Sequence, residues 1–398
     1  MTELIKIGAS FALIVGLLRL RWHIGIVMLL GAVFLGSLYL IGPLRQSQII
    51  LASSIDMVTV NLVTGLVLIM VLENVIRKKG VLKRMLEAVV NVAQDRRIAM
   101  AVLPGVIGLL PSAGGAAFSA PMVQEAAAEV EMRPEHKAFI NYWFRHIWEY
   151  ISPLYPGVVL ATAVTGVPLN KFLLSQFPLP LAVVGVGVAL GFRGMKVQGV
   201  SGKRDMNEIR ALFLTLLPII ISIVLVVLFK MPLALAMMSI VIAMFAFFQY
   251  SAKEILTTLK ESISLNMILM VIGIMVFKGM LDATGAIEAL PVYFRQSGLP
   301  AGFVWFVLPF IVGLLTGLTV GFVGVTFPII TAMMGGNPDL GVISFAFASG
   351  FAGVMLSPTH LCLLLTIRYF NADMAGTYRL MYLPVFLVFT AGLIRLWV

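Results

Sequence analysis

Three ionisable side chains lie close together in an otherwise apolar stretch. Arg145 and Glu149 are four residues apart, a spacing that places them on one helix face where they can form an ion pair, and His146 lies between them. A second histidine, His360, occupies another apolar stretch. Ionisable groups at membrane depth are costly and mark solute or proton pathways. These four residues are therefore candidates for coupling, with a self-neutralised structural pair and a satisfied core histidine as the alternatives.

Both apolar stretches contain a Ser-Pro pair, at 152–153 and 357–358. Proline removes a backbone donor and disfavours helix at the residue before it, so each span is predicted to break into two half-helices. A helix that is merely kinked is the alternative, but two such breaks favour a binding site near the bilayer midplane. The candidate residues at the breaks are Ser152, Pro153, Tyr155, Ser357, Pro358, Thr359 and His360.

A glycine-rich turn precedes each Ser-Pro pair. The stretches 98–128 and 300–335 are apolar with Gly and Pro in the middle, which predicts re-entrant helical hairpins. Small residues let backbone approach a ligand closely, and a helix that restarts after the turn offers N–H groups to an anion. Tight helix packing is the alternative. The candidate solute- or ion-binding residues are Ser112, Ala113, Gly114, Gly115 and Ser119 at the first turn and Thr319, Gly321, Gly324 and Thr326 at the second.

Identical residues recur about 205 positions apart, which indicates two copies of one unit. Duplication within a membrane domain points first to a secondary transporter. The matches include Asn61 with Asn266, Gly80 with Gly285, Pro104 with Pro309, Gly108 with Gly313 and both Ser-Pro pairs.

The composition is that of an integral membrane protein. Hydrophobic residues make up 60% of the chain and charged residues 12%, and the mean hydropathy is +1.04. Spans of roughly 20 apolar residues predict an all-α polytopic protein with about ten crossings. Five crossings and one hairpin in each copy force the second copy to be inverted relative to the first. The predicted crossings are 4–20, 23–42, 57–75, 138–165, 172–192, 211–229, 232–249, 264–280, 341–367 and 378–397.

The predicted organisation is two inverted repeats joined by a basic linker. The first repeat, 1–192, contains scaffold spans within 4–75, an interfacial arm at 80–92, the hairpin 98–128, the broken span 138–165 and the span 172–192. The linker is 193–210. The second repeat, 211–398, contains scaffold spans within 211–280, an arm at 285–297, the hairpin 300–335, the broken span 341–367 and the span 378–397.

The net charge of +10 follows from basic loops and gives no reason to expect nucleic acid as a partner. The connection at 77–97 is strongly basic, whereas its counterpart at 281–299 carries one arginine, Arg295, so equivalent loops face opposite sides. The positive-inside rule then predicts a multi-pass protein of the cytoplasmic (inner) membrane, with the basic loops in the cytoplasm and both termini outside. One cysteine, Cys362, excludes an internal disulfide and predicts no metal cluster.

The stretch 141–153, NYWFRHIWEYISP, resembles an uncharacterised prokaryotic integral membrane family, a domain-of-unknown-function family of the ion transporter (IT) superfamily that also holds dicarboxylate, citrate and gluconate carriers. The resemblance covers nearly the whole chain. It implies an elevator fold, a homodimer, a fixed scaffold and a mobile transport domain. Dicarboxylate carriers have Ser-Asn-Thr at each hairpin tip for sodium and a substrate carboxylate, whereas this chain has SAG at 112–114 and TVG at 319–321, so sodium coupling of that kind and the substrate do not carry over.

We therefore expect a secondary-active transporter, without cofactor, that moves a small anionic solute across the bilayer coupled to H⁺ or Na⁺. The anion is expected because helix N-termini and Arg145 converge on the proposed cavity. A channel or the membrane subunit of a multi-component transporter is the alternative. A transporter powered by ATP within this chain is not expected, because no G-x-x-x-x-G-K-[ST] motif occurs. An intramembrane enzyme is not expected, because the chain contains no H-E-x-x-H motif, no paired aspartates for a metal and no G-x-S-x-G motif.

Overall fold

The computed structural model describes residues 2–93, 95–111, 115–128, 130–195, 206–285, 300–335 and 337–396, and the regular structure in these ranges is helical, without a strand. Several helices are long and apolar enough to cross a membrane, as expected for a multi-pass membrane protein. These are α4 (Met57–Lys78), the α10–α11 segment (Leu169–Gly191), α12 (Met206–Val227), α15 (Leu265–Ala283) and α21 (Met374–Ile394).

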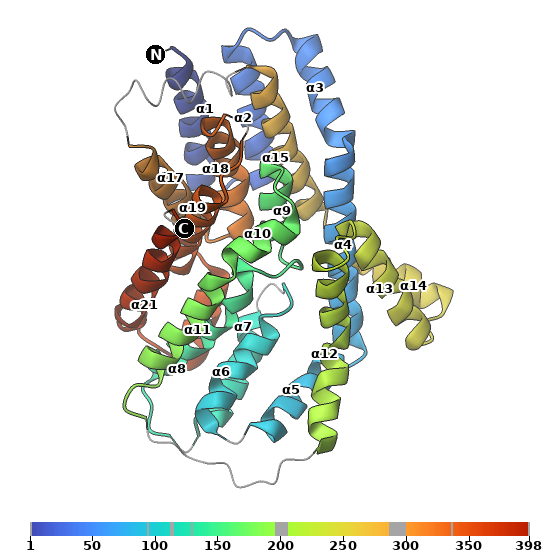
Figure 1. Cartoon of the computed structure of the whole chain (residues 1–398), viewed down its shortest axis with the longest axis vertical. Coiled ribbons are helices and arrows are strands. Elements are labelled where there is room, and N and C mark those ends of the chain that lie inside the picture. The colour runs from blue at the N-terminus through green and yellow to red at the C-terminus, as the bar shows by residue number, and fades with distance from the viewer. Residues whose placement is uncertain are drawn as a thin grey trace.

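The first helices of the chain include one that the hydropathy pattern did not predict. The chain starts with α1 (Thr2–Arg19) and α2 (Ile24–Leu38), and α3 (Pro43–Ile55) then leads into α4. In Figure 1, α3 and α4 follow one another along one edge of the molecule. After α12, α13 (Leu233–Phe247) is likewise followed by an unpredicted helix, α14 (Ala252–Ser262), which begins with a capping box between Ser251 and Glu254.

Two helix pairs form the predicted hairpins. The first consists of α6 (Arg96–Ile107) and α7 (Gly115–Ala126), and the amphipathic helix α5 (Val81–Val92) precedes it. The second consists of α17 (Ala301–Thr316) and α18 (Thr319–Met333), joined through Gly317, whose φ of 63° favours glycine. Residues 112–114 of the first turn, most of the second arm (286–297) and most of the linker (196–205) lie outside the described residues.

Both helices that carry a Ser-Pro pair are interrupted at that pair, as predicted. The first is divided into α8 (Pro134–Arg145), a 3₁₀ turn η1 (Ile147–Tyr150) and α9 (Pro156–Thr165). The second is divided into α19 (Leu340–Met355) and α20 (Leu361–Phe370). Pro156 occupies the first turn of α9, where its missing N–H costs no hydrogen bond. The helices α10 (Leu169–Gln176) and α11 (Pro178–Gly191) follow α9, and α21 follows α20.

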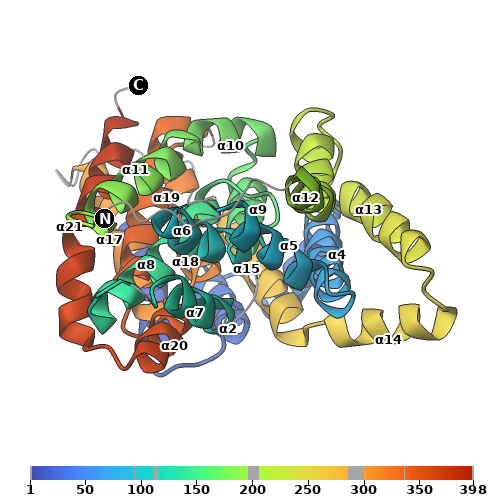
Figure 2. The same cartoon turned by 90° about the horizontal axis from the view of Figure 1, so that it is seen from below.

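The helices form two groups, which Figures 1 and 2 show from two directions. On one side are α4, α12, α13 and α14, and on the other are α8, α11, α17, α19 and α21. Helix α2 packs along α15, and α4 packs along α13. Gly25 and Gly273 let α2 and α15 approach so closely that a Cβ on either would meet the backbone of the opposite helix. Both interrupted helices lie in the second group, against the hairpins.

Candidate functional site

A cluster of buried polar side chains lies where the two interrupted helices meet. Arg145, His146 and Glu149 come from the end of α8 and from η1, His360 comes from the start of α20, and Thr319 comes from the start of α18. Each of the five exposes 8% or less of its surface. The structure thus brings the predicted group of Arg145, His146 and Glu149 together with His360 and Thr319, which were proposed separately. We call these five residues the polar cluster.

The two histidines of the cluster face each other. The Nε2 atoms of His146 and His360 are 3.1 Å apart. Each Nδ1 lies against a backbone carbonyl, that of Tyr142 at 2.6 Å for His146 and that of Gly317 at 2.7 Å for His360. A carbonyl oxygen only accepts, so both Nδ1 atoms carry hydrogen and both Nε2 atoms are left to share the space between them. Two facing lone pairs repel, and that space therefore requires a hydrogen or a cation.

Glu149 is held by groups from both halves of the chain. Its Oε2 accepts a hydrogen bond from the Thr319 hydroxyl at 2.8 Å. Its Oε1 lies 3.9 Å from Arg145 Nη1 and 3.7 Å from His146 Nε2. The expected Arg145–Glu149 pair is present, but it is part of a larger group and not an isolated pair. A buried carboxylate is stable only with such compensation.

Hydroxyl groups fasten the second hairpin to the second break. Ser357 donates to the carbonyl of Leu314 at 2.7 Å and lies 2.9 Å from the hydroxyl of Thr359. Thr359 in turn donates to the carbonyl of Leu315 at 3.3 Å. The end of α17 is thereby tied to the interruption between α19 and α20.

The first hairpin is fastened to the first break by aromatic donors. Tyr155 donates to the carbonyl of Gly108 at 2.5 Å, and Trp148 Nε1 donates to the carbonyl of Gly105 at 2.8 Å. Each hairpin therefore docks on the interrupted helix that follows it in the chain.

One further contact between the halves escaped the sequence analysis. Asn141 Nδ2 donates to the Thr366 hydroxyl at 3.0 Å and lies 3.2 Å from the carbonyl oxygen of Ala116, so it joins α8, α20 and α7. Asn141 is fully buried. An asparagine among aromatic and aliphatic residues indicates a buried hydrogen bond, but the sequence does not show which residue is its partner.

Other predicted residues do not reach the polar cluster. Ser119 and Thr326 bond carbonyls of their own helices. Gly321 packs against Thr316, and Gly324 packs against Ile274 of α15. Gly115 begins α7 and is buried. The contacts seen at these residues are helix-packing contacts.

Ser152 caps the turn of the first break by accepting from the amide of Leu154 at 3.3 Å, and Pro153 lies within that turn. The candidates Ser112, Ala113 and Gly114 lie outside the described residues.

A cavity of about 390 Å³ lies between the two groups of helices. Glu73, Asn74 and Arg77 of α4 line one side, and Pro111 and Phe118 of the first hairpin line the other. The Oδ1 atom of Asn74 is buried and has no hydrogen-bond partner in the described structure. These α4 residues were not predicted from the sequence, because charged groups near a helix end usually extend to the membrane surface.

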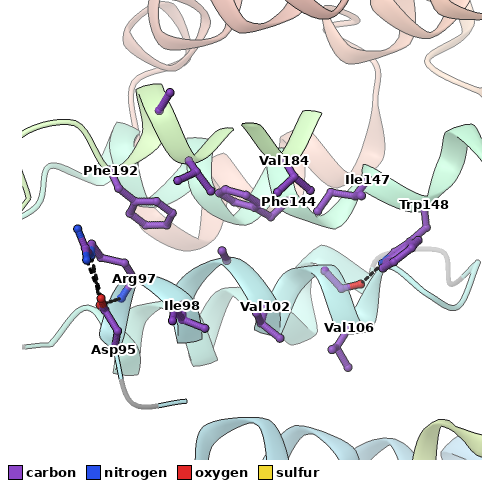
Figure 3. Close-up of a pocket in the computed structure, with 14 residues that line it drawn as sticks. Asp95, Arg97, Ile98, Val102, Val106, Phe144, Ile147, Trp148, Val184 and Phe192 are labelled. Atoms are coloured by element: carbon purple, nitrogen blue, oxygen red, sulfur yellow. Dashed lines mark hydrogen bonds and ion pairs between the residues drawn. The ribbon is translucent and has the colours of Figure 1, made fainter. Parts of the chain in front are cut away.

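A second cavity, of about 520 Å³, has a different character. It lies between α6 on one side and α8, η1 and α11 on the other, and Figure 3 shows its apolar lining. Ile98, Val102 and Val184 are typical of that lining. At one end, Arg97 donates to Asp95 at 2.7 Å and holds the pKa of that carboxyl below its usual range. This cavity has few polar groups that could orient a solute.

Several helices are long and apolar enough to cross a membrane, which indicates a multi-pass α-helical membrane protein, and buried ionisable groups lie where its two interrupted helices meet. Residues 6–398 match the model of the family described as Protein of unknown function (DUF401), and the chain belongs to that family. A search of curated proteins found no match.

Proposed function

We propose that this chain is a secondary-active transporter that moves a small anionic solute across the cytoplasmic membrane, as a homodimer, by an elevator-type alternating-access movement coupled to H⁺ or Na⁺. The polar cluster is the observation that carries the proposal. Burying the charges of Arg145 and Glu149 costs on the order of several kcal/mol of desolvation each, and the sum is comparable to the net stability of a folded domain. Such a cost is retained at sites that handle ions or charged solutes.

The helix boundaries support a duplicated architecture. Adding 205 to the bounds of α9 gives 361–370, the range of α20. The same shift carries α6 to 301–312, within α17, and α4 to 262–283, which covers α15. Interrupted helices at equivalent places in two inverted halves are the usual frame of a midplane solute site.

The contacts of four helices, α2 with α15 and α4 with α13, support a division into scaffold and transport domain. The shift of 205 also relates α2 to α13, so the α2–α15 contact and the α4–α13 contact are counterparts. We assign these four helices to the scaffold, and both hairpins and both interrupted helices to the moving unit. The 390 Å³ cavity then lies on the surface along which the two would slide.

The dipoles at the cluster favour negative charge. The N-termini of α9, α18 and α20 converge there, since Gly157 packs on Thr319 and His360 bonds Gly317. Each helix N-terminus carries roughly half a positive charge, and Arg145 adds a full one. The carboxylate of Glu149 neutralises part of this positive potential, and an anionic solute would neutralise the remainder.

The test begins with binding to the purified full-length protein. Small organic and inorganic anions, screened with and without sodium at several pH values, should raise the unfolding temperature of the protein in proportion to RT ln(1 + [L]/Kd). The best anion is then followed into proteoliposomes under an imposed H⁺ or Na⁺ gradient. Uptake should saturate with solute and accelerate with one of the two gradients.

Variants of matched charge separate the site from the surface. Glu149→Gln should reduce gradient-driven uptake at least tenfold, whereas Glu87→Gln on α5, whose carboxylate is half-exposed, should leave it unchanged. Non-saturating flux that ignores both gradients would show a channel instead. Stabilisation by cations or neutral solutes alone would remove the anion from the proposal.

A further inference from the structure

The residues that line the space between the two histidines include a third donor. Cys362 is the second residue of α20. Its sulfur, one ring nitrogen of His146 and one ring nitrogen of His360 all lie within 4.8 Å of one another. All three residues are buried. The chain has one cysteine, so this sulfur cannot be held in an internal disulfide.

Both imidazoles are oriented as metal ligands usually are. A ligating histidine almost always donates its other ring N–H to a carbonyl or carboxylate, which fixes the ring and leaves the remaining nitrogen basic. The carbonyls of Tyr142 and Gly317 provide this for His146 and His360. The ring of Tyr142 packs edge-on against both, with centroid distances of 4.6 and 5.5 Å, and limits the access of water.

The distances suit a tetrahedral ion. Zinc–nitrogen bonds of about 2.05 Å at a tetrahedral angle place two ligand nitrogens roughly 3.3 Å apart, close to the 3.1 Å between the two Nε2 atoms. The sulfur would have to come to about 3.6 Å from each nitrogen, which requires a movement on the order of 1 Å. Glu149 Oε1 lies 3.7 Å from His146 Nε2, and a shift of this carboxylate toward the other donors would let it take the fourth position.

We propose that His146, His360 and Cys362, with Glu149 as the fourth ligand, bind one borderline transition-metal ion, Zn²⁺ in the first place. Two imidazoles and one thiolate are the donors that such an ion prefers over Mg²⁺ or Ca²⁺. Binding releases the thiol proton and the hydrogen between the imidazoles. The divalent ion, one thiolate and one carboxylate are together neutral, which suits a buried site. The single cysteine had led to the opposite expectation.

The ion would join the two halves of the molecule. His146 follows α8, whereas His360 and Cys362 begin α20, so one ion would hold the two interrupted helices together. The proposal concerns binding and does not depend on transport. If the chain is a transporter, occupancy by zinc should arrest it.

The experiment uses full-length protein without an affinity tag, stripped with chelator and titrated with Co²⁺, followed by displacement with Zn²⁺. One equivalent of Co²⁺ should produce intense visible d–d bands and a near-ultraviolet thiolate charge-transfer band. Cys362→Ser should remove the charge-transfer band, and His360→Ala should weaken Zn²⁺ binding at least tenfold. His136→Ala is the matched control, because His136 also lies on α8 but its ring hydrogen-bonds to the carbonyl of Gly191, away from the proposed site.

Three outcomes would overturn the proposal. These are the absence of a cobalt spectrum in the full-length protein, binding that survives in the double variant Cys362→Ser/His360→Ala, and equal losses in His136→Ala and His360→Ala. Size-exclusion elution of each variant is measured first, and His360→Gln replaces His360→Ala if the alanine variant aggregates. A protein that binds zinc but transports no solute would leave the site standing while the proposed function fails.

Discussion

The hydroxyl of Thr319, at the tip of the second hairpin, donates to Glu149 in the first interrupted helix at 2.8 Å. This contact crosses between the halves of the chain and ends on a buried carboxylate. It links the position of the hairpin to the electrostatics of the polar cluster.

Replacing Thr319 by Val should destabilise the protein by about 1–3 kcal/mol, because Glu149 loses a hydrogen bond where water cannot replace it. The measurement is the unfolding midpoint in detergent. Thr326→Val is the control, since Thr326 is also buried but its hydroxyl bonds only its own helix, donating to the carbonyl of Phe322 at 2.7 Å. Equal decreases in the unfolding midpoint of the two variants would show that the Thr319–Glu149 hydrogen bond stabilises the protein no more than a hydrogen bond within one helix.

Gly313→Ala should weaken the packing of α17 on α19. A Cβ at Gly313 would overlap the carbonyl oxygen of Gly350. A backbone atom cannot relieve this overlap by changing rotamer, as a side chain could. A loss of about 1–3 kcal/mol is expected from such overpacking. Gly302→Ala in the same helix meets nothing within 4 Å and should gain up to about 1 kcal/mol from helix propensity. The unfolding midpoint of Gly313→Ala should be lower than that of Gly302→Ala, and the reverse order would contradict the prediction.

Acid should loosen the start of the first hairpin. Arg97 lowers the pKa of Asp95 below its ordinary value of 3.8, so the stability that this carboxylate contributes is present above that value and is lost as the pH falls through the lowered pKa. Asp95 also caps α6 by accepting from the amide of Arg97 at 2.9 Å. Hydrogen-exchange protection of the first turn of α6 should hold down to about pH 4 and fall as the pH drops further through the lowered pKa.

Asp95→Asn provides the comparison for that measurement, because an amide oxygen can still cap a helix but has no charge to lose. The variant should show a flatter pH dependence of protection. A slope as steep as that of the unchanged protein would mean that other groups dominate.

A cysteine placed at Lys83 should be labelled only from the cytoplasm. The Lys83 side chain on α5 is 83% exposed and belongs to the basic connection after α4. Cys362 is buried, so the background from the natural cysteine should be low. Labelling of intact cells with a membrane-impermeant maleimide tests the orientation, and a signal before the membrane is opened would reverse it.

The local chemistry of the chain predicted where its helices break, because proline and left-handed glycine act on their own neighbours. Both interruptions fall at the Ser-Pro pairs, and Gly317 turns the second hairpin. Helices α3 and α14 were missed, since each is short and has polar residues along its length, and hydropathy alone does not distinguish such a helix from a loop.

The partners within the site could not be predicted in the same way. His146 and His360 were each proposed, but their contact depends on how two distant helices dock. The direction of a hydroxyl is equally hidden, because Ser119 and Thr326 satisfy carbonyls of their own helices while Thr319 does not. Asn141 and Thr366 have no counterpart at the repeat offset to draw attention to them.

The crossed pairing of α2 with α15 and of α4 with α13 has a consequence for biogenesis. When α2 and α4 leave the ribosome, the helices that will cover them have not been synthesised. Helices α2 and α4 must therefore first be inserted with the faces that will contact α15 and α13 exposed to lipid acyl chains. They can reach their final packing only after α15 has been inserted. A gene cut between α11 and α12 should yield two fragments that degrade when made singly and survive when made together.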